Sequence, residues 1–262
     1  MTTYSPLFFT FEIISLIFKK SKTPTVFEKS SAIDIIPLMG CLTLYLLLAL
    51  IFLLPLLFAE MITGAFVLLG FSPGAAFIML LAVLIGSGIN IPIKTWYEDY
   101  DYIPPNSYFQ SLISGLIAKP HKKILAINLG GAIIPTLISL WQIKRLFTEF
   151  ASSHPQGVAV FVFVFLLNTY VCNRTAKMVP YKGITIPAFI PPITVAIPTL
   201  LLAPDIAPII AFPAGVLGVL LGADILHLNE IKNMPGPGGS IGGAGTFDGV
   251  FLSGIISVFL TG

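Results

Sequence analysis

The sequence predicts an all-α membrane protein, a polytopic bundle in which about seven helices span the bilayer. Hydrophobic residues make up 56% of the 262 residues and charged residues only 10%, with a mean hydropathy of +0.95. Soluble domains carry about 25% charged residues, so this chain cannot cover itself with a polar surface. The apolar residues also gather into long runs, and the basic residues lie mostly between them. We therefore expect the lipid bilayer to be the main partner of the chain.

Residues 1–34 precede the first long apolar run and form a predicted N-terminal cytoplasmic or interfacial segment. The stretch Met1–Phe18 has no basic start and no small-residue cleavage site, so we do not expect a cleaved signal peptide. A short helix on the membrane surface, followed by several lysines, fits this pattern better. Residues 35–262 are then predicted to form the transmembrane bundle, with a glycine-rich loop at 234–247.

The chain contains seven apolar runs that reach, or nearly reach, the roughly 20 residues that a spanning helix needs. In order they are Ile35–Phe58, Pro73–Ile93, Ile124–Leu140, Val158–Cys172, Ile184–Ala203, Ile206–Leu226 and Phe247–Leu260. The fifth run contains four prolines, and the third contains an asparagine and two glycines. Either these two helices are broken at a binding site, or they are kinked and inert.

The basic residues predict the orientation of the bundle. With seven spans, twelve of the fourteen basic residues lie on the same side of the membrane as the N-terminus. Only Lys144 and Arg145 lie on the other side. Cytoplasmic loops carry an excess of Lys and Arg. We therefore expect a protein integral to the cell membrane, with its N-terminus in the cytoplasm and its C-terminus outside.

The second and third runs resemble the sixth and seventh. Ile85-Gly86-Ser87 matches Leu221-Gly222-Ala223, and the string Ile127–Ala132 matches Gly239–Ala244. The matched runs point in the same direction, which indicates a possible 3+1+3 parallel repeat, a plan that some transporters use. Chance similarity between runs rich in glycine and isoleucine is the alternative.

Two aspartates are candidates for chemistry, because ionisable groups at membrane depth are costly and usually functional. Asp224 lies near the cytoplasmic end of the sixth run and shares a helix face with His227, three residues further on. Asp248 opens the seventh run, either as a functional acid or as a helix cap where the dipole favours its charge. The glycine-rich loop between them allows the two carboxylates to meet. Facing carboxylates share a proton.

Asn128 and Ser240 occupy matching positions in the possible repeat and complete the candidate site. The predicted ligands of a substrate or ion are Asp224, His227, Asp248, Asn128 and Ser240. We assign no metal and no cofactor, since no HExxH, P-loop or Rossmann pattern is present and the two cysteines stand apart in apolar runs. No combination of basic and aromatic residues indicates nucleic acid.

The strings Gly222-Ala223-Asp224 and Ser240–Gly249 resemble an uncharacterised family of archaeal and bacterial membrane proteins, catalogued as domain of unknown function 1614. Ile89–Pro92 and Pro187–Pro192 are similar to that family as well. The resemblance runs from about the first apolar run to the end of the chain, and it implies no activity.

A looser resemblance connects the chain with presenilin-type intramembrane aspartyl proteases, through Gly222-Ala223-Asp224 and Pro187-Ala188-Phe189. Here Phe189 stands where those proteases have leucine, and the Pro-Ala element precedes both aspartates. The resemblance implies a catalytic pair, which in this sequence would be Asp224 and Asp248.

Three functions are compatible with these patterns. We favour a transporter or channel-like protein for a small molecule or ion, in which Asp224 and Asp248 bind a proton or cation. The first alternative is an intramembrane aspartyl protease, with one of the two carboxylates as base and the other as acid. The second is a structural membrane subunit without chemistry. The sequence leaves the substrate and the oligomeric state open.

Overall fold

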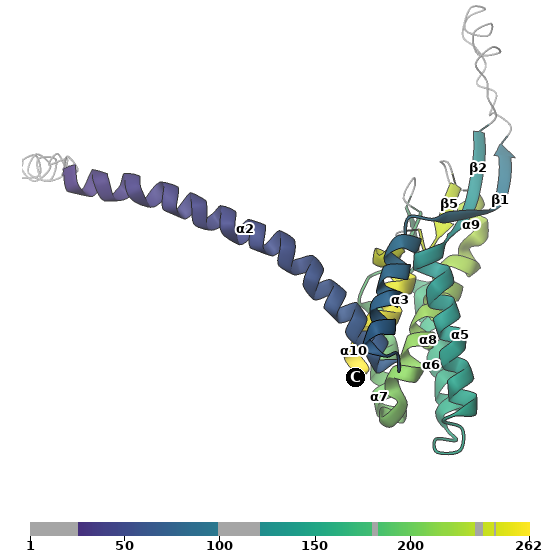
Figure 1. The fold of residues 1–262 in the computed structure, drawn as a ribbon. Helices are drawn as coiled ribbons and strands as arrows, with labels where there is room; N and C mark the ends of the chain where they lie inside the picture. The colour runs from purple at the N-terminus through teal and green to yellow at the C-terminus, as the bar shows by residue number, and fades with distance from the viewer. Residues whose placement is uncertain (1–25, 99–120, 180–182, 234–237, 244) are drawn as a thin grey trace, which may run out of the picture. The chain divides into compact units, whose positions relative to one another are not determined.

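The computed structural model describes residues 26–98, 121–179, 183–233, 238–243 and 245–262, and apolar helices dominate this part of the chain (Figure 1). The surface helix predicted at Met1–Phe18 lies outside the described residues. Residues 1–57 and 58–262 are two separate compact units. The second unit holds every candidate site residue.

Each predicted apolar run contains all or part of a helix. The long helices are α2 (Val26–Leu68), α3 (Pro73–Gly86), α5 (Ile134–Thr148), α6 (Gly157–Thr175), α7 (Ile190–Leu202), α8 (Ala207–Val219) and α10 (Gly249–Thr261). Between them lie the short helix α9 (Leu228–Asn233), two π-helices, η1 (Leu129–Ile133) and η3 (Leu220–Asp224), and three 3₁₀ turns, η2 (Pro204–Ile206), η4 (Ile225–His227) and η5 (Gly245–Phe247). The predicted helical bundle is confirmed.

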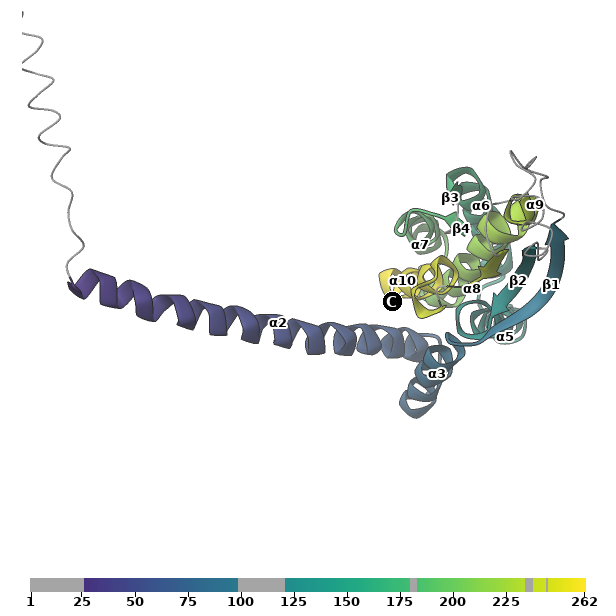
Figure 2. The same ribbon diagram turned by 90° about the horizontal axis from the view of Figure 1, so that it is seen from above.

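Two small sheets accompany the helices (Figure 2). The strands β1 (Asn90–Glu98), β2 (His121–Asn128) and β5 (Gly238–Ile241) form one sheet in the order β1-β2-β5, with β1 antiparallel and β5 parallel to β2. The strands β3 (Lys177–Val179) and β4 (Gly183–Thr185) form a two-stranded antiparallel sheet.

The strands correct two predicted spans. The second predicted helix was to continue to Ile93, but α3 ends at Gly86 and β1 begins at Asn90. The third was to begin at Ile124, but this residue lies in β2, and regular α-helix starts at Ile134. β2 pairs with a strand on each side, and a central strand reads as a continuous apolar run, which hydropathy alone does not distinguish from a helix.

The start of the fifth span was also predicted too early. Its first residues form β4, and α7 begins only at Ile190. Pro187 explains the delay, because a proline disfavours helical geometry in the residue before it. Pro191 and Pro192 then lie in the first turn of α7, where the missing amide hydrogen has no intrahelical acceptor.

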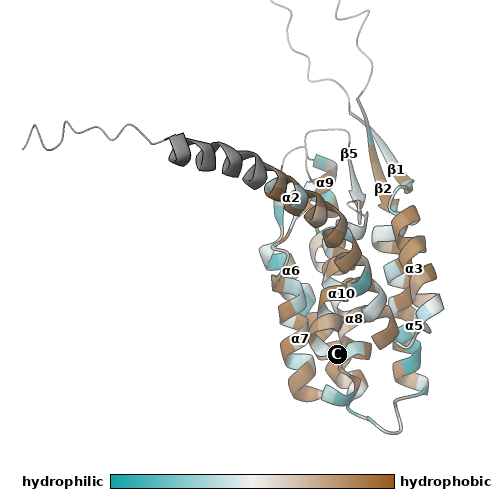
Figure 3. Cartoon of the chain, turned by 60° about the vertical axis from the view of Figure 1, so that its left-hand side comes forward, coloured by the Kyte–Doolittle hydropathy of each residue, from teal (hydrophilic) through white to brown (hydrophobic). Residues whose placement is uncertain are grey.

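The helices have the length and surface of a membrane protein. Cys41–Leu68, Gly157–Thr175 and Pro204–Ile231 are long and apolar enough to cross a membrane, and α3, α7 and α10 are shorter apolar helices. Hydrophobic residues run along the outward faces of α3 and α7 (Figure 3). Phe77 on α3 and Leu201 on α7, for example, are 55% and 77% exposed. Because such faces are stable only against lipid or another apolar surface, the chain is a membrane protein.

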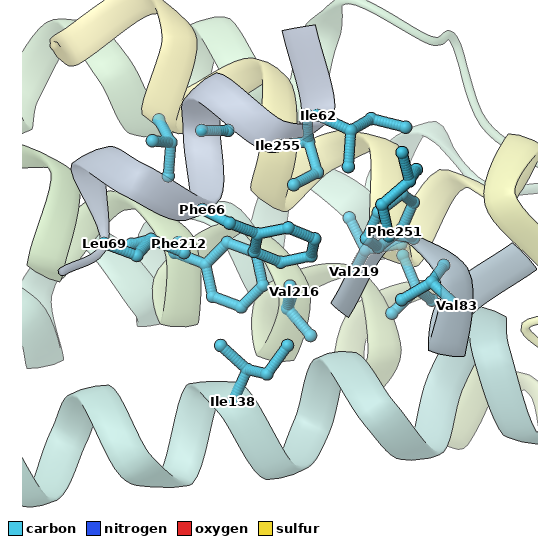
Figure 4. Packing of buried hydrophobic residues seen from close by; sticks show 14 of the residues in the cluster. Ile62, Phe66, Leu69, Val83, Ile138, Phe212, Val216, Val219, Phe251 and Ile255 are labelled. Atoms are coloured by element: carbon cyan, nitrogen blue, oxygen red, sulfur yellow. The ribbon is translucent and has the colours of Figure 1, made fainter. Parts of the chain in front are cut away.

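The core of the second unit surrounds α8, which contacts α5, α6, α7 and α10. A helix that is apolar all round belongs in the centre of a bundle. Phe212 on α8, Phe66 at the end of α2 and Phe251 on α10 are fully buried and lie together (Figure 4). The last turns of α2, from Phe58 onward, are therefore part of this bundle.

Two side chains of α5 fix the end of α2. The Leu69 carbonyl oxygen accepts hydrogen bonds from Gln142 Nε2 (2.8 Å) and Arg145 Nη1 (2.7 Å). Arg145 Nε also binds Glu149 Oε2 at 2.8 Å. The last carbonyls of a helix have no intrahelical donor, so these bonds satisfy one of them. Gly70, with a φ of +93°, then turns the chain toward α3.

Candidate functional site

Asp224 is the last residue of the π-helix η3, which continues α8. π-helical turns are rare and are frequent at functional sites, because they place side chains and backbone groups outside the regular α-helical pattern. On the α6 side, Gly222 packs so closely that an added Cβ would lie 2.4 Å from the Thr169 carbonyl oxygen. Asn173 Nδ2 lies 3.5 Å from the Gly222 carbonyl oxygen, a long hydrogen bond. The position of Asp224 is therefore set by the contact between α6 and η3.

Asp248 is the N-cap of α10. Its Oδ1 accepts a hydrogen bond from the Val250 backbone N–H at 2.9 Å, and its own backbone is extended, with φ −73° and ψ 146°. The cap role that the sequence left as one of two alternatives is confirmed. The cap places the acidic side chain of Asp248 at the positive end of the α10 dipole, which favours the ionised form of such a group.

Asp224 and Asp248 line the same cavity, which has a volume of about 240 Å³. The two carboxyl groups lie close enough for their charges to interact. The rest of the lining is apolar or neutral and comes from four segments: Ile184, Thr185, Ile186, Ala188, Val219, Ala223, Gly249 and Leu252. In such surroundings like charges repel more strongly than in water. The cavity therefore suits a positively charged occupant, or one proton shared by the pair.

Asn128 and Ser240 lie in a different place, a polar network beside the three-stranded sheet. Asn128 is fully buried, and its Nδ2 donates to the Ser87 carbonyl oxygen (2.8 Å) and to Asn90 Oδ1 (3.2 Å). Its Oδ1 accepts from the Gly131 backbone N–H at 2.7 Å. Ser240 Oγ donates to the same Asn90 Oδ1 at 2.7 Å. Asn90 thus links the two predicted residues to each other, and neither lines the aspartate cavity.

Close backbone contacts at Gly130, Gly131 and Gly242 lie beside this network, and we call them the glycine junction. A Cβ on Gly130 would lie 2.2 Å from the Val83 carbonyl oxygen, and one on Gly131 would lie 2.1 Å from that of Gly242. No side chain larger than hydrogen fits at either position. In the same region Ser87 Oγ accepts from the Thr246 backbone N–H at 2.9 Å. The junction fastens the end of α3, the start of η1 and the glycine-rich loop together.

His227 joins neither group. It lies in the 3₁₀ turn η4, is half-buried, and does not line the cavity. In the described part of the chain its Nδ1 is buried and has no hydrogen-bond partner. The expected face shared with Asp224 assumed α-helical spacing, but the chain changes from a π-helix to a 3₁₀ turn between these two residues.

Several residues of the aspartate cavity and of the polar network were not predicted as site residues from the sequence. Ser87, Asn90 and Thr246 belong to the network, and Thr185 belongs to the cavity. A sequence signal existed for the network, since Ser87 and Asn90 are the polar side chains within the second apolar run. No comparable signal marked Thr185, because its place depends on how β4 folds back toward α10.

The donor set of the cavity consists of two carboxylates and one hydroxyl. Among the described residues no three histidine, cysteine or acidic side chains gather closely enough to hold a metal ion together. The carboxylate pair can bind a monovalent cation, a protonated amine or a proton. With one carboxyl group protonated and one ionised, it can also carry out acid–base chemistry.

The comparisons with known proteins give one match, to a family of unknown function. A family model described as a protein of unknown function (DUF1614) matches residues 84–260, more than half of the chain. No curated protein and no solved structure matches the chain, so the looser resemblance to presenilin-type proteases gains no support. The matched region includes both aspartates and the whole polar network. The chain therefore belongs to the DUF1614 family, whose function is unknown.

Proposed function

We propose that this protein moves a small cation or a proton across the membrane, with Asp224 and Asp248 as the groups that bind it. One observation carries the proposal: the two acids, 24 residues apart in the sequence, line a single cavity between apolar helices. Ionisable residues within membrane helices usually mark the path of an ion or a proton. A purely structural subunit has no need for two interacting carboxylates at such a place.

The size of the cavity favours a small occupant. Pockets for drug-sized ligands measure about 300–1,000 Å³, and this cavity measures about 240 Å³. That space holds an ion with some of its water, or a small organic cation. An extended peptide needs a longer groove. The volume therefore supports transport of a small solute over cleavage of a polypeptide.

The local backbone supports the same function. η3 departs from α-helical geometry directly at Asp224, and Asp248 lies at the first turn of α10. Transporters commonly place ion ligands where a membrane helix is interrupted, since carbonyls and helix ends become available there. Proline residues within α7 and α8, Pro198 and Pro213, give both helices a further departure from ideal geometry.

The distribution of basic residues supports a cytoplasmic position for the cavity. Arg174 lies in the last turn of α6, the helix that packs on η3, and Lys177 begins β3 shortly after it. Cytoplasmic ends of membrane helices carry the excess of such residues. In this orientation the carboxylates receive or release their ion at the cytoplasmic face.

Flux measurements in proteoliposomes test the proposal. The protein is reconstituted, and the uptake of protons and of monovalent cations is recorded over a range of pH for the wild type and for the double variant Asp224→Asn, Asp248→Asn. Asparagine is as good an N-cap as aspartate, so the variant removes charge without removing the cap of α10. We expect flux in the wild type and its loss in the variant; equal flux in both proteins excludes the carboxylates from the mechanism.

The aspartate pair also satisfies the first requirement of an intramembrane aspartyl protease, and this is the second candidate function. A cleavage assay separates the two. Purified protein is incubated with a transmembrane peptide substrate, with the single variant Asp224→Asn as control. Cleavage by the wild type alone, without flux in proteoliposomes, would replace the transport proposal with the protease.

A further inference from the structure

A groove between α2 and α3 is lined by an acidic residue, Glu60, which is not part of the aspartate cavity. The groove has a volume of about 370 Å³. Its lining comes from one face of α2 and from the first turns of α3: Glu60, Thr63, Gly64, Val67, Pro73 and Phe77. Apart from Glu60 and Thr63, these residues carry no polar side chain.

Glu60 lies well inside the apolar part of α2. The segment Cys41–Leu68 is long and apolar enough to cross a membrane. Leu68 ends the helix eight residues after Glu60, which corresponds to about 12 Å along the axis. The hydrocarbon core of a bilayer is about 30 Å thick. The carboxyl group therefore lies about 12 Å from the C-terminal end of the apolar segment, inside the segment and not at its edge.

The Glu60 carboxyl group has no counter-charge within the described part of the chain. The salt bridges there join Arg145 to Glu149 and His154 to Asp205. Thr63 does not serve Glu60 as a side-chain donor, because its hydroxyl donates to the backbone carbonyl oxygens of Ala59 and Glu60. An acid at this depth is expensive, and such residues normally pair with another group.

Glycines leave open space at the groove. Apart from the helix's own backbone and the neighbouring residues, no atom lies within 4 Å of the place where a Cβ would stand on Gly64, which lines the groove, or on Gly74, which follows Pro73 in α3. Small residues allow another helix to approach the backbone closely in a membrane. Val67 and Phe77, which are 43% and 55% exposed, give the neighbouring surface an apolar character.

From these observations we infer that the groove docks a transmembrane helix of another protein, one that is apolar except for a single basic residue near its middle, which pairs with Glu60. Charge complementarity selects this occupant. A second copy of this chain is a poor match, because no basic residue occurs between Cys41 and Gly86. Two copies joined through this face would bring apolar side chains or a second carboxyl group to Glu60.

A host–guest experiment tests this inference. The full-length protein, labelled with a fluorescence donor, is reconstituted in phosphatidylcholine liposomes together with acceptor-labelled helical peptides of leucine and alanine. One peptide carries a central arginine, and its matched control carries leucine at the same position. We expect the arginine peptide to associate about fivefold or more tightly than the leucine peptide.

Variants of the protein then assign the effect to Glu60. Glu60→Leu removes the preference for the arginine peptide, whereas Asp205→Asn, at an exposed acid away from the groove, retains it. An unchanged thermal unfolding midpoint shows that Glu60→Leu is folded. The inference is overturned if both peptides bind equally to the wild type, or if Glu60→Leu keeps the preference. Self-association of the labelled protein that depends on Glu60 would also overturn it, in favour of a second copy.

Discussion

At the scale of single residues, Asn128 and Asp224 were expected in one site and have different surroundings. Asn128 is fully buried, and both ends of its side-chain amide are hydrogen-bonded within the protein. Asp224 lines a cavity together with a second acidic residue, Asp248. A side chain whose hydrogen bonds are used inside the protein stabilises the fold, whereas a charge beside a cavity is available to a ligand. We therefore expect substitutions of these residues to affect different properties.

Replacing Asn128 by alanine should lower the stability of the protein. The change leaves the Gly131 backbone N–H and the Ser87 carbonyl oxygen without these partners, at a cost of about 2–4 kcal/mol. Unfolding in mixed micelles of detergent and dodecyl sulfate, followed by circular dichroism, measures the loss. Asn173→Ala is the matched control, because its hydrogen bond is long and the residue only half-buried; we expect a loss below about 1 kcal/mol. Equal losses in both variants would contradict a special role for Asn128.

Two substitutions of Asp248 separate its cap from its charge. Asp248→Ala removes the acceptor for the Val250 N–H and should lower stability by about 0.5–2 kcal/mol, whereas Asp248→Asn keeps an acceptor and should cost much less. Both variants remove the charge and should lose flux. The unfolding assay above and the proteoliposome assay measure the two properties independently. Full flux in Asp248→Asn would show that the residue serves only as a cap.

At the scale of secondary-structure elements, the glycine junction connects α3, η1 and the glycine-rich loop through backbone contacts. Gly131→Ala is expected to lower stability by about 1–3 kcal/mol or more, because its Cβ meets the Gly242 carbonyl oxygen, which cannot move without the turn that follows β5. Gly64→Ala is the control, since its Cβ meets no atom within 4 Å. Thermal unfolding in detergent compares the two variants. A similar midpoint for both would mean that the junction tolerates expansion.

The elements also show what the sequence could predict. Apolar runs located every long helix of the described chain, because a membrane helix needs length and hydropathy and little else. The cap by Asp248 was also foreseeable, since aspartate is a favoured N-cap. The strands β1 and β2 were not, because their pairing joins segments that are distant in the sequence. Hydropathy gives no information about such partners.

The sequence also did not predict where the helices end, and for α2 this error hid the position of Glu60 within the helix. The first span was predicted to end at Phe58, whereas α2 continues to Leu68 and packs on the bundle through Phe66. A span ending at Phe58 would leave Glu60 in a loop, although this residue belongs to the apolar helix. The structure shows that the helix continues past this acidic residue, and Phe66 in its last turns packs with Phe212 of α8 and Phe251 of α10.

At the scale of the whole molecule, the orientation in the membrane is the first property to establish. Single cysteines are introduced at Ser152, between α5 and α6, and at Lys177, in β3, both exposed, in a background that lacks Cys41 and Cys172. The positive-inside rule predicts that a membrane-impermeant maleimide labels residue 152 from outside intact cells and residue 177 only after permeabilisation. The reverse pattern would place the aspartate cavity at the outer face.

The aspartate pair lies at one end of α8 and η3, and Asp205 lies near the other, with its side chain 81% exposed. The variant Asp205→Asn therefore serves as a control, because it removes one negative charge from the protein without changing the cavity. A protein that moves a cation through the cavity depends on Asp224 and is indifferent to Asp205.

The initial rate of cation or proton uptake by proteoliposomes, compared between Asp224→Asn and Asp205→Asn at equal protein content, tests the central proposal most directly. We predict that the rate falls about tenfold or more in Asp224→Asn, since loss of a buried charge partner of an ion typically raises the barrier by more than about 1.4 kcal/mol. We predict a rate close to that of the wild type in Asp205→Asn. Equal rates in the two variants would contradict a role of the carboxylate pair in transport.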